Sequence, residues 1–200
     1  MGVIDWAFSL DGIRPGLDRP SVLVVPVAVL DTLPFLSADQ LADTAHGGAP
    51  SVWRRQALVA LAARALGMAP AAVRLRADGD GRRFLGGTAI FASVAYRSGF
   101  AVAAIARVPI GVDIEAIDEA VAAGGVALEG FDGDAEALRR WHGPAGIWAA
   151  KEATLKLGGT GLGRSRYWRF DDSTVVVNDS ASVSIDRILY GDTVIAYALL

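Results

Sequence analysis

The chain has 200 residues, a length that suits one large domain or two small ones and is sufficient for a hydrophobic core. Hydrophobic residues make up 52% and charged residues 20% of the sequence, which excludes a chain that is mainly disordered. The 19 basic and 22 acidic side chains give a net charge of -3, so we expect neither nucleic acid nor an anionic membrane as a partner.

Cysteine is absent, which excludes disulfides, thiolate metal sites and cysteine nucleophiles and is compatible with a reducing compartment. The first basic residue is Arg14, so the N-terminus lacks the pattern of a secretory signal peptide. The longest nearly apolar stretch, residues 84–106, contains Arg97 and three glycines and favours two strands over a membrane helix. We therefore expect a cytoplasmic protein that does not enter a membrane.

The first predicted elements are a strand and a long helix. Val22 to Leu30 predicts a strand at a sheet edge or at the start of the fold, because Pro26 cannot donate a hydrogen bond within a central strand. Residues 51–67 hold good helix formers, with Ser51 as a possible N-cap and Gly67 as the stop.

Short strands and turns are expected after this helix. An alternating stretch and a turn rich in Asp and Gly come first, and two apolar runs around residues 97–99 then predict a hairpin. These segments are, in order, residues 73–76, 78–81, 88–96 and 100–106. The first half is therefore expected to be α+β with a mostly antiparallel sheet.

The second half opens with a predicted strand from Pro109 to Glu115, in which apolar and other residues alternate as on a half-buried strand. Side chains two positions apart share a face of a strand. Asp113 and Glu115 are therefore expected side by side, on the face opposite to Val112.

A loop over residues 116–133 and two helices are expected next. Gly143 and Pro144 divide the helical sequence, since proline suits a first helical turn, and Gly158 with Gly159 ends the second helix. Four short strands separated by Asp, Asn and Gly turns complete the chain, at residues 165–170, 174–177, 181–185 and 193–199. Each half, 1–108 and 109–200, would then hold one principal helix and one small sheet.

Trp148, Glu152 and Lys156 are spaced by four and lie along one stripe of the second helix. By itself this stripe is read as a core tryptophan beside an exposed Glu–Lys pair worth roughly 0.3–0.5 kcal/mol. Asp113 and Glu115 alone are likewise read as solvated charges. Together, three carboxylates and a lysine in apolar surroundings form an oxygen-rich set suited to Mg²⁺ and phosphate.

Residues 111–115, Gly-Val-Asp-Ile-Glu, and 148–156, Trp-Ala-Ala-Lys-Glu-Ala-Thr-Leu-Lys, resemble the two signature motifs of the 4′-phosphopantetheinyl transferase superfamily. Those motifs are G-[VI]-D-[IVL]-E and W-x-x-K-E-[AS]-x-x-K. The likeness covers residues 50–160, and the long segment before the first motif resembles the surfactin-synthetase-type class. It implies a monomer of two pseudo-symmetric α+β halves with the active site in the cleft between them.

The resemblance implies an enzyme that moves the 4′-phosphopantetheine arm of coenzyme A (CoA) to a serine of an apo acyl or peptidyl carrier protein. Adenosine 3′,5′-bisphosphate is the other product. Asp113, Glu115 and Glu152 would hold Mg²⁺ against the CoA pyrophosphate. Lys156 would lie against the same phosphates, and Lys151 is a further implied CoA contact. Glu152 is also the implied acceptor of the serine proton.

One segment departs from the family pattern. The family usually carries Ser-His-Ser, whose histidine contacts the CoA 3′-phosphate, where this chain has Ala-Tyr-Arg at residues 95–97. Tyr96 cannot become cationic, whereas Arg97 brings a permanent charge and a fork that matches phosphate. We expect Arg97 to substitute for the histidine if it faces the site, and CoA binding to be weaker if it faces away. The other candidate phosphate contacts are Arg54, Arg82 and Arg83, each of which is read equally well as a surface arginine.

Two alternatives to transfer stay open at this point. A noncatalytic CoA- or carrier-protein-binding relative would keep the motifs and lose turnover through the change at Tyr96. A Mg²⁺-dependent nucleotide pyrophosphohydrolase would also use acidic clusters, but it would not need the lysine-bearing helix motif.

Overall fold

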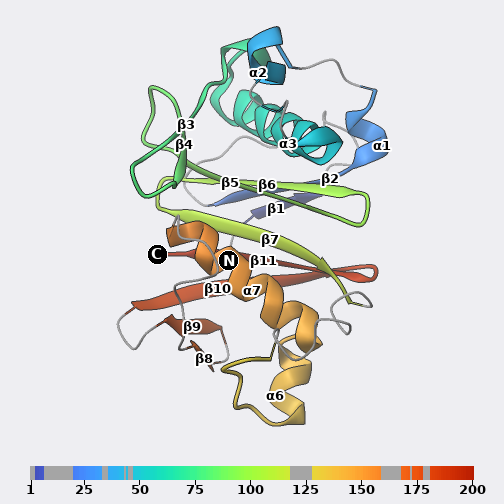
Figure 1. Cartoon of the computed structure of the whole chain (residues 1–200), viewed down its shortest axis with the longest axis vertical. Coiled ribbons are helices and arrows are strands. Elements are labelled where there is room, and N and C mark those ends of the chain that lie inside the picture. The colour runs from blue at the N-terminus through green and yellow to red at the C-terminus, as the bar shows by residue number, and fades with distance from the viewer. Residues whose placement is uncertain are drawn as a thin grey trace. The chain divides into compact units, whose positions relative to one another are not determined.

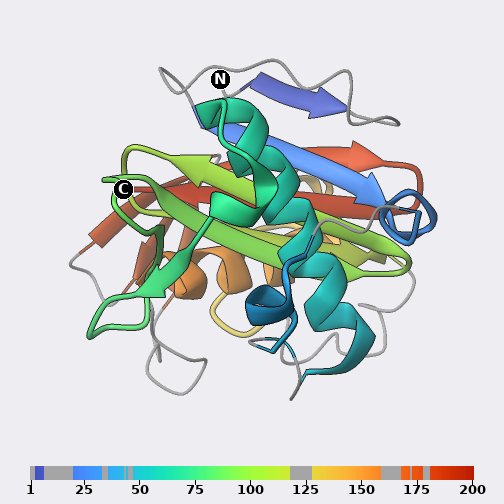
Figure 2. The same ribbon diagram turned by 90° about the horizontal axis from the view of Figure 1, so that it is seen from above.

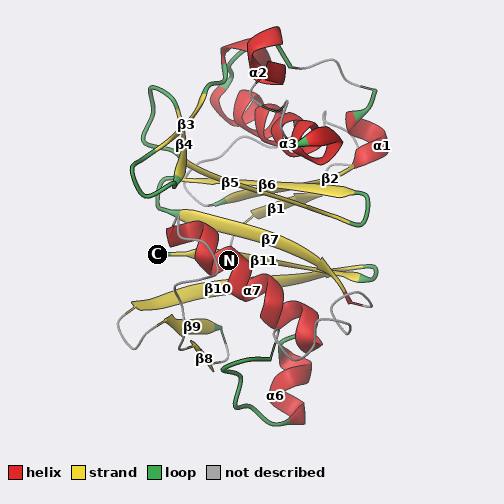
Figure 3. Cartoon of the chain, in the orientation of Figure 1, coloured by secondary structure: helices red, strands yellow, loops and turns green. Residues whose placement is uncertain are grey.

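A computed structural model of the chain describes residues 3–6, 20–32, 36–42, 44, 47–117, 128–158, 168–171, 173–177 and 181–200. The fold is α+β, as the sequence predicts, and the chain divides into two compact units, Met1–Val108 and Pro109–Leu200. Helices and strands are distinguished by colour in Figure 3. In this described part, no helix combines the length and the apolar composition needed to cross a membrane.

The first unit is built on a six-stranded sheet with the order β1-β2-β6-β5-β4-β3. Only the pair β1 and β2 is parallel, and the other neighbours are antiparallel. The strands are β1 (Val3–Trp6), β2 (Ser21–Pro26), β3 (Leu75–Ala77), β4 (Arg83–Leu85), β5 (Phe91–Arg97) and β6 (Phe100–Ala106).

One face of this sheet is covered by α3 (Gly48–Leu66), which crosses the strands (Figures 1 and 2). A run of residues along the middle of α3, 56–63, is buried and packs on apolar side chains of β2, β5 and β6. The smaller helical elements of the unit are α1 (Val27–Leu30), α2 (Ala38–Ala42) and the 3₁₀ helix η2 (Pro70–Ala72).

The structure confirms the long helix and corrects its beginning. Gly67 ends α3 in the left-handed conformation, with φ of 65°, as the sequence predicts. Ser51 is not the N-cap, because the helix already begins at Gly48 and Gly47 precedes it. The hydroxyl of Ser51 instead accepts a hydrogen bond from the Arg54 guanidinium at 3.0 Å.

The strand predicted from Val22 to Leu30 is shorter and lies inside the sheet. It ends at Pro26, after which the chain turns into α1, and β1 and β6 flank it on its two sides. The proline is tolerated because it is the last residue of the strand, where the ladder ends.

The predicted hairpin is confirmed in β5 and β6, whose turn consists of Ser98 and Gly99 with φ of 48° and 81°. Positive φ at both positions is typical of the tight turns that suit strand twist. Residues 88–90, predicted as part of β5, instead form the turn after β4, where the Thr88 hydroxyl donates to the Leu85 carbonyl at 2.8 Å.

The second unit has a five-stranded antiparallel sheet with the order β7-β11-β10-β9-β8. Its strands are β7 (Ile110–Ala116), β8 (Trp168–Asp171), β9 (Thr174–Val177), β10 (Ala181–Tyr190) and β11 (Thr193–Leu199). The helices are α6 (Ala135–Arg140) and α7 (Gly143–Gly158), divided where the sequence predicts, and α7 packs on β7 and β11 (Figure 1).

The strands β9 and β11 match their predicted ranges, and β10 runs five residues beyond its predicted end at Ile185. Its extra residues pair with β11 as far as the turn at residues 191–192. Gly159, residues 165–167 of the predicted strand and residues 118–127 of the predicted loop lie outside the described residues.

Candidate functional site

The first motif lies directly beneath the backbone of α7. A Cβ atom on Gly111 would stand 1.8 Å from the Ala153 carbonyl oxygen and 2.8 Å from the Leu157 nitrogen. Only a residue without a side chain fits at this point. Small residues on the neighbouring strand, Ala196 and Ala198, complete the surface on which the helix packs.

The two carboxylates of this motif face the same helix, because Gly111, Asp113 and Glu115 alternate onto one face of β7. Asp113 is 6% exposed and Glu115 is 7% exposed. The alternative interpretation of the isolated pair, as solvated charges, is therefore wrong, and the strand is buried on both faces rather than half-buried. Burial of charged groups is costly unless they are neutralised or paired.

Lys156 of the second motif supplies a positive charge to this face. Its Nζ atom donates to Asp113 Oδ1 at 2.5 Å and to the Val112 carbonyl oxygen at 3.2 Å. On α7, the stripe of Trp148, Glu152 and Lys156 is half-buried. The interpretation of this stripe by itself, as an exposed Glu–Lys pair, therefore does not hold. The ion pair joins the two motifs, which are separated by more than thirty residues of sequence.

Glu152 belongs to the same electrostatic cluster. Burial, and next the negative charge of Asp113, raises the pKa of Glu152 above its usual value, while Lys156 acts in the opposite direction. The structure thus brings together Asp113, Glu152 and Lys156. Across the described ranges, however, no three Asp, Glu or His side chains come close enough together to hold a metal ion.

The pKa of Glu152 predicts how stability depends on pH. A raised pKa means that the folded chain binds this proton more tightly than the unfolded chain does. The free energy of unfolding should therefore fall as the pH rises from the ordinary value of 4.5 through the raised value. We expect Glu152→Gln to remove this fall and to raise the midpoint of thermal unfolding at neutral pH. Unfolding curves of both proteins from about pH 4 to about pH 8 would measure it. An equal dependence on pH in both would contradict this assignment.

Lys151, one position before Glu152, makes different contacts. Its Nζ atom donates to the Glu129 carbonyl oxygen at 2.5 Å and lies 5.9 Å from the centre of the Phe170 ring. Burial lowers the pKa of Lys151, and the charge of Glu129 partly offsets this effect. Each residue turns an α-helix by about 100°, so Lys151 and Lys156, five positions apart, point about 140° away from each other and reach different places.

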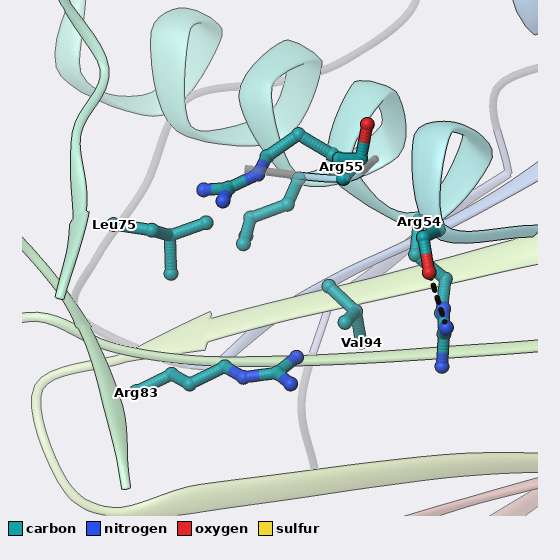
Figure 4. A pocket seen from close by; sticks show the side chains of 8 residues that line it. Arg54, Arg55, Leu75, Arg83 and Val94 are labelled. Atoms are coloured by element: carbon teal, nitrogen blue, oxygen red, sulfur yellow. Dashed lines mark hydrogen bonds between the residues drawn. The ribbon is translucent and has the colours of Figure 1, made fainter. Parts of the chain in front are cut away.

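A basic pocket lies in the first unit, between α3 and the strands β3, β4 and β5 (Figure 4). Its volume is about 180 Å³. It is lined by Thr44, Ser51, Arg54, Arg55, Leu58, Leu75, Arg83 and Val94. The helical residues Ser51, Arg55 and Leu58 follow one another at helical spacing, so they share a face of α3.

Three arginines and no acidic residue line this pocket. Burial, and next the like charge of Arg83, lowers the pKa of Arg54. The Arg54 guanidinium is held by the Ser51 hydroxyl at 3.0 Å and by the Pro50 carbonyl oxygen at 3.2 Å. Like charges gathered around a pocket favour an anionic ligand, and guanidinium groups suit phosphate in particular.

Two of the predicted phosphate contacts, Arg54 and Arg83, therefore meet at one pocket, whereas Arg82 does not line it. Arg82 forms ion pairs with Asp78 and Asp80 and closes the turn between β3 and β4. Sequence reasoning missed Arg55. Its position four residues after Ser51 was the signal that could have found it.

Tyr96 and Arg97 lie in the segment where phosphopantetheinyl transferases usually carry Ser-His-Ser, and their side chains point to opposite faces of β5. Tyr96 shares a face with Val94, and its ring centre lies 5.1 Å from that of Trp53 on α3. Arg97, the next residue, belongs to the other face by strand alternation and does not line the pocket. The Trp53 indole donates to Asp31 at 2.7 Å, which fixes the ring that contacts Tyr96.

No protein-family model matches the chain, and a search of curated proteins finds no match. The likeness of residues 111–115 and 148–156 to the two motifs is therefore the basis for the functional argument, together with the geometry described above.

Proposed function

We propose that the protein is a Mg²⁺-dependent 4′-phosphopantetheinyl transferase that modifies a serine of an apo acyl or peptidyl carrier protein with CoA as donor. The observation that supports it most is the contact of Lys156 with Asp113, which unites the two motifs in one partly buried cluster. Two similar halves with the active site in a cleft, a monomeric state and a cytoplasmic location are parts of the same proposal.

The carboxylates of Asp113, Glu115 and Glu152, where β7 and α7 face each other, offer the kind of oxygen that suits Mg²⁺. This hard cation prefers carboxylate oxygens, water and phosphate. Asp113 and Glu152 are close enough for one charge to raise the pKa of the other, so a cation between them would relieve their repulsion. In the proposal both hold the metal, with Glu115 as the third ligand. The three side chains must draw together when the metal binds, because they do not form a metal-holding group in the structure. The metal would neutralise negative charge on the CoA pyrophosphate.

The side chains of the cluster have distinct roles in the proposal. Lys156 places a positive charge where negative charge grows on the leaving phosphate oxygens. Glu152 accepts the proton of the carrier serine, directly or through water. The contact of Lys151 with Glu129 gives no support to a direct role of Lys151 in CoA binding.

We further propose that the basic pocket binds a phosphate group of CoA. The pocket brings together Arg54, Arg55 and Arg83 beside apolar side chains, a combination that suits a phosphate on an organic ligand. A second candidate function, a noncatalytic CoA- or carrier-binding protein, is favoured by one observation. Tyr96 occupies the family's histidine position and packs on Trp53, where it supplies no positive charge.

The experiment that tests the proposal is intact-protein mass spectrometry of several apo carrier proteins incubated with the protein, CoA and Mg²⁺. A mass gain equal to phosphopantetheine on any carrier, abolished by a chelator, is the expected result. CoA binding without a mass gain would favour the noncatalytic candidate. Release of nucleotide from CoA without any carrier would favour the pyrophosphohydrolase.

The neighbouring residues Arg82 and Arg83 offer a matched test of the pocket. We expect Arg83→Gln to weaken CoA binding about tenfold or more, because a charge-assisted phosphate contact is lost. Arg82→Gln, which removes the same charge from the turn beside the pocket, should leave binding within about twofold. Calorimetric titration with CoA would measure both dissociation constants.

The same titration decides the role of Arg97. If Arg97→Ala weakens the binding of CoA but not of 3′-dephospho-CoA, while Arg83→Gln changes neither, the 3′-phosphate is held by Arg97 and the assignment of the pocket is wrong.

A further inference from the structure

Lysine occurs at only two positions of the sequence, Lys151 and Lys156, and arginine supplies the other 17 of the 19 basic side chains. Both lysines lie on α7. An ammonium is a compact, strongly hydrated point charge, whereas a guanidinium is a planar fork. The choice of lysine in a chain that otherwise uses arginine indicates that a point charge matters at these two places.

Lys156 is bound as a small cation would be. Its Nζ atom contacts two oxygens on β7, the Asp113 carboxylate at 2.5 Å and the Val112 carbonyl at 3.2 Å. Carboxylate and backbone carbonyl oxygens are also ligands of hard metal ions. The ammonium thus contacts the side chain that the proposed function assigns to Mg²⁺.

The burial of the two partners is unequal. The side chain of Asp113 is 8% exposed and is fixed on a central segment of β7, whereas that of Lys156 is 31% exposed. The long, flexible stem of lysine lets its charged end move toward water while the carboxylate stays in place. Asp113 also lies near the Glu152 carboxylate, so a cation on this face reduces the repulsion between the two carboxylates whether or not metal is present.

We propose that the Lys156 ammonium is the resident cation of this face: it holds Asp113 until a divalent cation takes that carboxylate, and it then turns to the phosphates of the bound ligand. This inference rests on the proposed function, in which Asp113 is a metal ligand. It makes metal and CoA binding cooperative, because the phosphates receive the displaced ammonium. Metal alone must compete with Lys156, whereas metal and CoA together satisfy both Asp113 and Lys156.

The two lysines allow a direct test on the unmutated protein. Protein labelled with ¹³C and ¹⁵N only in lysine has two side-chain NMR signals, which Lys156→Met assigns. When saturating Mg²⁺ is added, and again when CoA follows, the signal of Lys156 should shift. The signal of Lys151, held by the Glu129 carbonyl and Phe170, should stay as an internal control. A Lys156 signal that does not move while the protein binds Mg²⁺ overturns the inference.

Binding of Mn²⁺, followed by the electron paramagnetic resonance signal of the free ion, gives a second test. Without CoA, Lys156→Met should bind Mn²⁺ about tenfold more tightly than the parent, since the competing cation is gone and the Met stem fills the same space. Lys151→Met removes an equal charge from the same helix and should change affinity less than about threefold. Equal effects of the two variants would overturn the inference, because they would show only general electrostatics.

The outcomes separate this inference from the proposed function. One result would overturn this inference and still support the transferase: the carrier is modified, the Lys156 signal does not move, and Lys156→Met binds Mn²⁺ as the parent does. The opposite result would overturn the proposed transferase and support this inference: no carrier is modified, but Lys156→Met binds Mn²⁺ more tightly than the parent does. Absence of Mn²⁺ binding in every variant, with and without CoA, overturns the inference and the proposed metal site together.

Discussion

Replacement of Asp113 by asparagine should abolish phosphopantetheine transfer, by at least about a hundredfold, while the protein remains folded. Asparagine keeps the shape of the side chain and removes the charge that the proposed metal and Lys156 both use. The folded state should survive because Lys156 is partly exposed and its ammonium can turn to water. Mass spectrometry of the carrier protein over time measures the rate, and circular dichroism reports on the fold.

Asp186→Asn is the matched control for this change. Asp186 lies on β10 of the same unit, is exposed and accepts a hydrogen bond from the Tyr197 hydroxyl at 2.7 Å. Asp186→Asn removes the same charge as Asp113→Asn, but Asp186 does not belong to the cluster of Asp113, Glu152 and Lys156. The variant should therefore transfer phosphopantetheine at the rate of the parent. A chelator should inactivate the parent in the same way as Asp113→Asn. Transfer at the parent rate in Asp113→Asn would show that the carboxylate has no part in the chemistry.

Gly111→Ala should lower the free energy of unfolding by about 3 kcal/mol or more. The new methyl group would stand 1.8 Å from the Ala153 carbonyl oxygen. The methyl group is attached directly to the backbone of β7 and the oxygen belongs to the backbone of α7, so neither can turn aside as a flexible side chain could. The helix and the strand must separate. Because Lys156 reaches Asp113 across this contact, the variant should also lose transfer activity. Urea unfolding followed by tryptophan fluorescence gives the change in free energy.

Gly79→Ala provides the comparison for this effect. A Cβ atom at Gly79 would meet no heavy atom within 4 Å. Its free energy of unfolding should therefore stay within about 0.5 kcal/mol of that of the parent. Equal stability of Gly111→Ala and the parent would mean that β7 and α7 are not held as closely as their backbones indicate.

Local patterns predicted many of the elements. The apolar run of β6, the Ser-Gly turn before it and the proline at the second position of α7 each depend on near neighbours in the chain. Gly67 ends α3 for a reason that is equally local, its left-handed φ. The alternation in β7 correctly placed Asp113 and Glu115 on one face, because strand geometry alone decides which residues share a face.

Contacts between distant segments decided the rest. Asp113 and Glu115 are buried rather than solvated because α7 covers their face, and its approach depends on Gly111. Arg54 and Arg83 meet because α3 packs on β5, the strand that pairs with β4, while Arg82, adjacent in sequence, pairs with the acidic turn. The position of β2 inside its sheet likewise depends on β1, a strand too short to predict. Periodicity reports which residues share a face, but what covers that face is set by packing between elements far apart in the sequence.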